Sequence, residues 1–192
     1  MTWTKGTSTK RRRKEAAGFT LLEALIAIVI LSFGILSLAV VYAQGIQVAA
    51  MTQMDYIAEK KTEEAVETIF AARDSKILAW TNIRNVTGLG GANDGVFLVG
   101  PQPLLAAGPD GLYGTQDDDA ANPMVVIMGP GPDGVLGTAD DVVMSLGGMK
   151  RTIAITDIPG SPGLRQITIT MNYTVGALKR QYTLVSYIAQ FS

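Results

Sequence analysis

Two acidic segments hold the residues of this chain whose types and spacing could do chemistry. They are GPDGLYGTQDD, which begins at Gly108, and GPDGVLGTADD, which begins 23 residues later at Gly131. Eight of their eleven positions are identical, so they form an internal repeat. A hard cation such as Ca²⁺ takes about six to eight oxygen ligands, and carboxylates are its commonest partners in proteins. The candidate Ca²⁺ ligands are Asp110, Asp117 and Asp118 in the first repeat and Asp133, Asp140 and Asp141 in the second.

The repeat allows a second interpretation, in which both segments are plain turns. Pro-Asp-Gly favours a tight turn, because proline presets φ and glycine accepts a positive φ. This accounts for the first half of each repeat, but not for the two aspartates that return behind Gly-Thr. The hydroxyl of Thr115 or Thr138 could add a ligand there, although the spacing is not that of an EF-hand. Ca²⁺ and plain turns therefore stay open as alternatives.

The composition argues against an enzyme. The chain contains neither cysteine nor histidine, so it lacks a thiolate nucleophile, a zinc site built from sulfur and the commonest general base. No serine lies in a nucleophile-elbow pattern, which argues against a secreted hydrolase. We therefore predict that the protein is not an enzyme.

Charge is distributed unevenly along the chain. Six of the 16 basic residues lie before Gly18, together with a single acid, Glu15. From Phe19 onward, ten Lys and Arg stand against 16 Asp and Glu, a balance of −6. An acidic body is a poor match for a nucleic-acid backbone, so we predict no nucleic-acid binding by the main domain.

A long apolar run near the amino terminus predicts a membrane-spanning helix. Residues 19–41 comprise 23 positions, of which Glu23 alone is ionisable. At about 1.5 Å per residue, the helix would cover about 34 Å, enough for a hydrocarbon core of about 30 Å. Because Lys and Arg stay on the cytoplasmic side, the basic start predicts a cytoplasmic amino end and an exported body. A cleaved secretory signal is the alternative, but its apolar region usually has only about 7 to 15 residues.

Glu23 needs an explanation, because an acid at the centre of such a helix costs about 2.5–3.5 kcal/mol, and less near its end. In one interpretation the carboxylate reaches back to the lipid headgroups, or is protonated, and does nothing else. In the other it is kept for a partner, which is the default hypothesis for an ionisable residue within a membrane.

The stretch GFTLLEALIAIVIL, residues 18–31, resembles the type III signal of type IV pilins and type II secretion pseudopilins. In this resemblance Gly18 is the last leader residue, Phe19 the first mature residue and Glu23 the fifth. The resemblance implies that a prepilin peptidase removes residues 1–18 on the cytoplasmic side and methylates the new amine of Phe19. That amine, on a neighbouring subunit, would neutralise Glu23, and such a pair penalises every misaligned register of helix packing.

The helical pattern continues beyond the membrane-spanning run to about Trp80, without a proline. Its apolar positions recur at steps of three, four or seven and are Met51, Met54, Ala58, Ala65, Ile69 and Ala72. Charges occupy the opposite face, where Lys60 and Glu64 are spaced for an ion pair. We therefore predict an assembly helix over 19–42 and an amphipathic helix over 43–80, whose sequence looks most like PilV-type minor pilins and related pseudopilins.

The remainder of the chain predicts loops followed by a sheet. Residues 81–148 are rich in glycine and aspartate, and within them 96–99 (VFLV) and 124–128 (MVVIM) are candidate edge strands. RQITITMNYTV, 165–175, alternates apolar with polar residues, which is the period of a half-buried strand. With 150–155 and 180–188 on either side, residues 149–192 predict an antiparallel meander packed on the amphipathic helix.

Together these patterns predict an α+β, pilin-like fold and a structural subunit of a type IV pilus or type II secretion pseudopilus, most similar to a minor pilin. The resemblance implies three sets of partners: prepilin peptidase, other pilin or pseudopilin subunits, and the assembly machinery. The subunit is expected in the bacterial inner membrane as a single-pass protein with a periplasmic head, and then in the filament. The alternative is a single-span anchored domain that binds calcium or another ligand and never polymerises.

Overall fold

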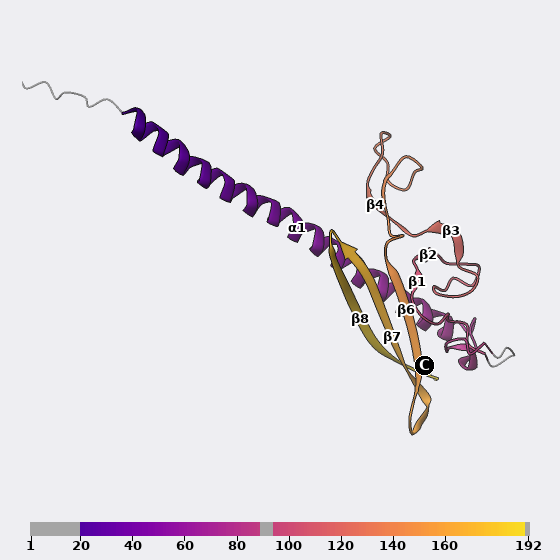
Figure 1. The fold of residues 1–192 in the computed structure, drawn as a ribbon. Coiled ribbons are helices and arrows are strands. Elements are labelled where there is room, and N and C mark those ends of the chain that lie inside the picture. Colours follow the sequence, from indigo (N-terminus) through magenta and orange to yellow (C-terminus); the bar gives the residue numbers. More distant parts are fainter. Residues whose placement is uncertain (1–19, 89–93, 191–192) are drawn as a thin grey trace, which may run out of the picture. The chain divides into compact units, whose positions relative to one another are not determined.

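The computed structural model describes residues 20–88 and 94–190 (Figure 1). The chain divides into two units, Met1–Ile46 and Gln47–Ser192. Helix α1, Leu21–Asp74, supplies all the described secondary structure of the first unit and continues into the second. Its apolar part is long enough to cross a membrane by length and composition, and none of that part is buried.

Thr20 begins helix α1 as its N-cap. The Thr20 side-chain oxygen accepts a hydrogen bond from the backbone N–H of Glu23 at 3.2 Å, and its carbonyl accepts one from Ala24 at 3.1 Å. A Thr three residues before a Glu is the pattern of a capping box, which satisfies N–H groups that have no partner within the helix. Glu23 therefore lies in the first turn, where the helix dipole favours an acid.

Helix α1 ends at Asp74, six residues before the predicted end near 80. Lys76 has a left-handed φ of 59°, and its N–H donates to the carbonyl of Arg73 at 3.0 Å. The N–H of Leu78 donates to the carbonyl of Ala72 at 3.2 Å, and the chain then forms a short 3₁₀ helix, η1, Trp80–Asn82. These bonds satisfy the last carbonyls of the helix and redirect the chain.

A four-stranded antiparallel sheet packs against the second part of the helix (Figure 1). Its strands are β1 (Gln102–Pro103), β6 (Lys150–Ile158), β7 (Ser161–Val175) and β8 (Leu178–Ala189), in the order β1-β6-β7-β8. Two small antiparallel sheets accompany it: β2 (Leu105–Ala106) with β3 (Asp119–Pro123), and β4 (Val125–Gly129) with β5 (Val142–Ser145). The predicted α+β, pilin-like fold class is confirmed.

Both candidate edge strands were placed wrongly. The segment from Val96 forms only an isolated bridge, Asn85 with Phe97, because it packs Phe97 into the core instead of extending a sheet. The segment from Met124 is a strand, but it pairs with β5 in a separate hairpin. The edge position beside β6 is taken by β1, which has two residues and includes a proline.

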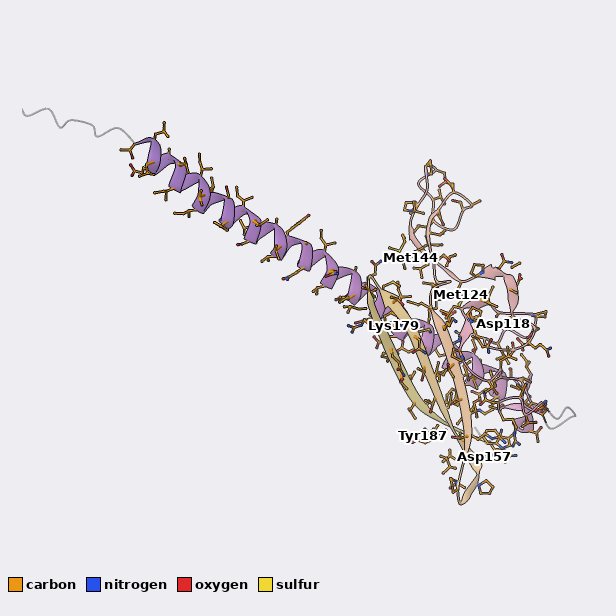
Figure 2. The ribbon with its side chains drawn as sticks, viewed as in Figure 1. Asp118, Met124, Met144, Asp157, Lys179 and Tyr187 are labelled. Atoms are coloured by element: carbon orange, nitrogen blue, oxygen red, sulfur yellow. The ribbon has the colours of Figure 1, made fainter. Side chains whose placement is uncertain are left out.

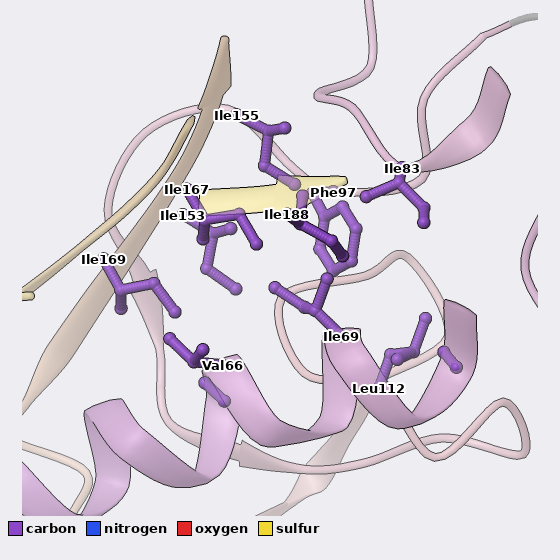
Figure 3. Close-up of a cluster of buried hydrophobic side chains, with 12 residues drawn as sticks. Val66, Ile69, Ile83, Phe97, Leu112, Ile153, Ile155, Ile167, Ile169 and Ile188 are labelled. Atoms are coloured by element: carbon purple, nitrogen blue, oxygen red, sulfur yellow. The ribbon is translucent and has the colours of Figure 1, made fainter. Parts of the chain in front are cut away.

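The core lies between helix α1 and the sheet. Strand β7 buries every second residue, as its alternation predicted, and Ala58, Ala65, Ile69 and Ala72 of the predicted helical face are buried against it. Figure 3 shows Val66 and Ile69 of the helix facing isoleucines of the strands, with Phe97 among them. On the outer face of the helix the ion pairs are Lys60–Glu63 and Lys61–Glu64, at 2.7 and 2.6 Å, so the predicted Lys60–Glu64 pair is wrong.

Arg165 on β7 joins the segment after α1 to the sheet. Its side chain is only 3% exposed, and its guanidinium donates to the carbonyl oxygens of Trp80 and of Ile83, the latter at 2.9 Å. The same group donates to Asp157 at 2.7 Å and lies 4.2 Å from the centre of the Trp80 ring. One buried cation thereby holds three segments together, and its hydrogen bond lowers the pKa of Asp157.

Candidate assembly helix and aspartate loops

The processing residues and the assembly helix are described to different extents. Gly18 and Phe19, the candidate cleavage and methylation residues, lie outside the described residues. Glu23 is exposed in the first turn of α1, where the capping bond of Thr20 fixes the backbone around it. This role of Thr20 was not predicted from the sequence, although Thr-x-x-Glu before an apolar run is a recognisable helix-start signal.

The first unit presents apolar side chains around the whole circumference of its helix. Every residue from Leu21 to Ile46 is exposed, and the large apolar side chains among them include Leu22, Leu25, Ile26, Val29, Phe33, Leu36 and Val40. A helix that is apolar on all sides requires burial in a membrane or among other helices. This surface is therefore suited both to lipid and to the packing of helices in an assembly.

The first aspartate loop, residues 108–118, is closed by its own carboxylates. Its hydrogen bonds, donor first, are Gly111 N to Gly108 O (3.0 Å), Leu112 N to Asp110 Oδ1 (2.8 Å), Asp110 N to Asp117 Oδ2 (3.4 Å), Gly114 N to Asp118 Oδ2 (2.7 Å) and Thr115 Oγ1 to Asp117 Oδ1 (2.8 Å). A Cβ on Gly108 would lie 2.3 Å from the carbonyl oxygen of Asp117, so only glycine fits there.

The second aspartate loop, residues 131–141, repeats these five bonds, but the further bond from Thr115 Oγ1 to Asp118 Oδ1 at 3.1 Å has no counterpart, because Thr138 Oγ1 donates to the carbonyl of Val135 at 3.0 Å. The equivalent bonds are Gly134 N to Gly131 O (3.0 Å), Val135 N to Asp133 Oδ1 (2.8 Å), Asp133 N to Asp140 Oδ2 (3.1 Å), Gly137 N to Asp141 Oδ2 (2.6 Å) and Thr138 Oγ1 to Asp140 Oδ1 (2.7 Å). A Cβ on Gly131 would lie 2.1 Å from the carbonyl oxygen of Asp140. The residues that the two repeats share therefore produce the same kind of loop twice, each closed by hydrogen bonds within the loop.

The carboxylates of the loops differ in their electrostatics. Burial raises the pKa of Asp110 and of Asp118, whereas the hydroxyl of Thr115 lowers the pKa of Asp117. In the second loop the hydroxyl of Thr138 lowers the pKa of Asp140. One carboxylate oxygen, Oδ1 of Asp141, is buried and has no hydrogen-bond donor. Within residues 20–88 and 94–190, no group of three or more acidic side chains is placed to hold a metal ion.

The two loops differ most in what surrounds them. In the first loop Leu112 is 2% exposed, and the hydroxyl of Tyr113 donates to Glu64 of α1 at 2.6 Å. The guanidinium of Arg151, on β6, lies 4.8 Å from the centre of the Tyr113 ring, and its charge acts on Asp118. Tyr113 and Arg151 were not predicted as functional residues from the sequence, because their partners lie far away in the chain.

These features define a class of protein: an apolar helix suited to membrane anchoring, continuous with a helix that packs on a small antiparallel sheet. Residues 13–39 match the family model of the prokaryotic N-terminal methylation motif, which is the type IV pilin signal. Residues 13–39 therefore carry the signal of prepilin-processed, pilin- or pseudopilin-like proteins, and this match supports a protein of that kind. No curated protein and no solved structure matches the chain significantly.

The motif carries three consequences for this chain. It implies processing by prepilin peptidase and assembly with other pilins. It accords with membrane anchoring by the apolar part of α1. The family that the motif marks is structural. The match covers the signal and the first part of helix α1. The function of the second unit, Gln47–Ser192, must therefore be inferred from its own residues.

Proposed function

We propose that the protein is a structural subunit of a type IV pilus or type II secretion pseudopilus, of the minor-pilin type. The observation that carries the proposal is the exposed apolar helix that begins within the methylation motif of residues 13–39 and continues beyond it. Removal of residues 1–18 would leave that helix on the product, so processing yields a building block and not a released protein.

Before assembly, the subunit is held in the inner membrane with its amino end in the cytoplasm and its head in the periplasm. The basic residues before Gly18 and their absence from 19–41 support this orientation. The assembly machinery then transfers the helix from lipid into the filament. There Glu23 pairs with the amine of a neighbouring subunit's Phe19 and sets the register between helices.

The mature amino terminus tests this function. We expect mass spectrometry of the full chain, tagged at its carboxyl end and expressed with prepilin peptidase, to find a methylated Phe19 as the first residue. In cells without the peptidase the same chain should keep residues 1–18. A mature chain that begins beyond residue 41 would exclude assembly through the helix, and an unprocessed, anchored chain would favour the non-polymerising alternative.

A second candidate function is calcium binding by the aspartate loops. It is favoured by the buried Oδ1 of Asp141, which has no donor, and by the burial that raises the pKa of Asp118. Each loop already closes through its own hydrogen bonds, so Ca²⁺ would add to the closure and would not create it. The candidate ligands remain Asp110, Asp117, Asp118, Asp133, Asp140 and Asp141.

Calorimetry of the full chain decides between Ca²⁺ and plain turns. If calcium binds, titration into EGTA-treated protein gives heat and raises the melting temperature. At ten times Kd, one bound ion adds about 1.4 kcal/mol to the free energy of unfolding. Asp141→Asn should remove the part of the binding heat and of the rise in melting temperature that comes from the second loop, because an amide supplies less charge to the ion. The same concentration of Mg²⁺ is the control, and no heat with Ca²⁺ would leave only turns.

A further inference from the structure

Strand β8 forms one edge of the four-stranded sheet, and no described strand pairs with its outer side. It has 12 residues, contains no proline or bulge, and carries no charge from Gln181 to Ala189. The other edge is covered in part, because β1 pairs with the start of β6 and the side chain of Asn85 bonds to Ile153 and Ile155. Proteins usually protect a sheet edge with charge, proline, a bulge or a covering segment. The unprotected edge of β8 therefore indicates a site to which another strand can add.

The bonds of Asn85 show which backbone groups lie at the free edge of β8. Asn85 binds the carbonyl of Ile153 at 2.6 Å and the N–H of Ile155 at 2.8 Å, so both residues direct their backbone groups away from β7. Their partners on β7, Ile169 and Ile167, therefore direct theirs towards β8, because these groups alternate in direction along an antiparallel strand. The register of β7 with β8 then leaves the odd-numbered residues of β8 without a partner strand. They are Lys179, Gln181, Thr183, Val185 and Tyr187, and all five side chains are exposed.

The hairpin of β4 and β5 offers a second free edge, since no described strand other than β5 pairs with β4. The N–H of Leu146 donates to the carbonyl of Met124 at 2.8 Å, so in this register Val125 and Ile127 direct their backbone groups to the outer edge of β4. Their side chains are 46% and 47% exposed, whereas Val126 between them packs on the core. Two strands alone are marginally stable in water, and Figure 1 shows this hairpin projecting beyond the sheet. In β4, as in β8, the exposed side chains belong to the residues whose backbone groups lack a partner strand.

Strands β4 and β8 run in opposite directions along the part of helix α1 that belongs to the second unit. Strand β8 begins at the ion pair of Arg180 with Asp55 and ends where its last carbonyl accepts a hydrogen bond from Arg73, so it runs in the direction of α1. Strand β4 runs back towards Gln53, whose side chain donates to the sulfur of Met128 at 3.7 Å. Two copies whose helices point the same way can therefore place β4 of one antiparallel to β8 of the other.

Position and charge favour the hairpin of a second copy as the strand that adds to β8. The hairpin joins the head beside β1, at the opposite edge of the sheet from β8, since the N–H of Met124 donates to the carbonyl of Leu104 at 2.9 Å. Copies that lie side by side thus bring the hairpin of one next to β8 of the other. The hairpin carries the second aspartate loop, whereas the only charged residues of β8 are Lys179 and Arg180. Figure 2 labels Lys179 and Tyr187 towards the two ends of β8.

We propose that β4 of one copy adds, antiparallel, to the free edge of β8 in a second copy of this chain. The register that pairs the most large apolar side chains places Val125 opposite Tyr187 and Ile127 opposite Val185, and such cross-strand pairs stabilise a sheet. The acidic loop that follows β4 then lies beside Lys179. Because β4 and β8 are different surfaces of one head, the contact is heterologous and repeats from copy to copy. It goes beyond the proposed function, since it adds a contact between heads to the packing of helices.

Cross-linking tests the contact on the full chain in cells that contain prepilin peptidase. The chain has no cysteine, so Val125→Cys together with Tyr187→Cys introduces the only two thiols. We expect a short bis-maleimide to give a ladder of dimers and larger species, and each single variant to give dimers at most. The pair Val125→Cys with Lys179→Cys is the matched control. Lys179 is exposed at the same edge but eight residues away, about 26 Å along a strand, so this pair should give no ladder.

Charged pairs at the neighbouring positions provide the second arm. In the cross-linking chain, Val185→Lys with Ile127→Glu places opposite charges across the proposed contact, and Val185→Lys with Ile127→Lys places like charges there. Both positions are exposed, so neither pair disturbs the core. The ladder should be about fivefold stronger with opposite charges, because such pairs attract and like charges repel. Equal yields from the two, or no ladder from a chain that has lost its leader, would overturn the strand addition. Retention of the leader would contradict the proposed function instead, and the same gel shows both results.

Discussion

Glu23→Gln will be processed like the wild-type chain but will enter filaments at least about a hundredfold less. In the proposed pairing, an amide at position 23 leaves the methylated amine of the neighbouring subunit's Phe19 buried without its counter-charge. Removing one partner of a buried ion pair costs about 3–5 kcal/mol, and each 1.4 kcal/mol is about tenfold in affinity. The measurement is the ratio of the chain in sheared filaments to the chain left in membranes.

The structure offers a control that separates assembly from helix capping. The backbone of Glu23 is held by the side chain of Thr20 at 3.2 Å, and an acid in the first turn also interacts with the helix dipole. That dipole interaction is worth only about 0.3–1 kcal/mol. Thr20→Ala removes the cap and keeps the carboxylate, so it should reduce incorporation only slightly. Equal losses in the two variants would mean that Glu23 acts by starting the helix.

Local patterns predicted the elements whose partners are their neighbours in the chain. Strand β7 could be predicted because its apolar residues from Ile167 to Val175 recur with a period of two. The structure buries the face that these residues form. The start of α1 could also have been read, from Thr20 and Glu23. The end of α1 could not, because Lys76 is neither glycine nor asparagine and yet adopts a left-handed conformation. That turn follows from Leu78 packing on the core, which no local pattern encodes.

The aspartate repeat shows the same limit at the candidate site. The Pro-Asp-Gly turns and the requirement for the first glycine follow from residues within each loop. The two loops adopt a similar geometry, as the residues that they share indicate. Which loop is covered depends on Glu64 and Arg151, which lie on α1 and β6. Identical motifs therefore acquire different roles from their surroundings.

Arg165→Met will lower the free energy of unfolding of the head by about 3 kcal/mol. Methionine is apolar and of similar length, so it fills much of the same space but donates no hydrogen bond. The carbonyls of Trp80 and Ile83 then lose a charged donor, and a buried group left without a partner costs about 1–3 kcal/mol. Asp157 is 61% exposed, so in the variant its carboxylate forms hydrogen bonds with water. This limits the loss in free energy of unfolding. Urea titration of the processed chain in detergent measures this loss of stability through the fluorescence of Trp80, the single tryptophan of residues 19–192.

Arg180→Met is the matched control for this titration. Arg180 also pairs with an aspartate, Asp55, at 2.8 Å, but its side chain is 41% exposed whereas that of Arg165 is 3% exposed. An exposed ion pair contributes little, because water and salt screen it. The urea midpoint of Arg180→Met should therefore stay close to that of the wild-type chain. If the two variants unfold at the same midpoint, burial of the Arg165 guanidinium does not hold the segment after α1 on the sheet, and the apolar core alone carries that junction.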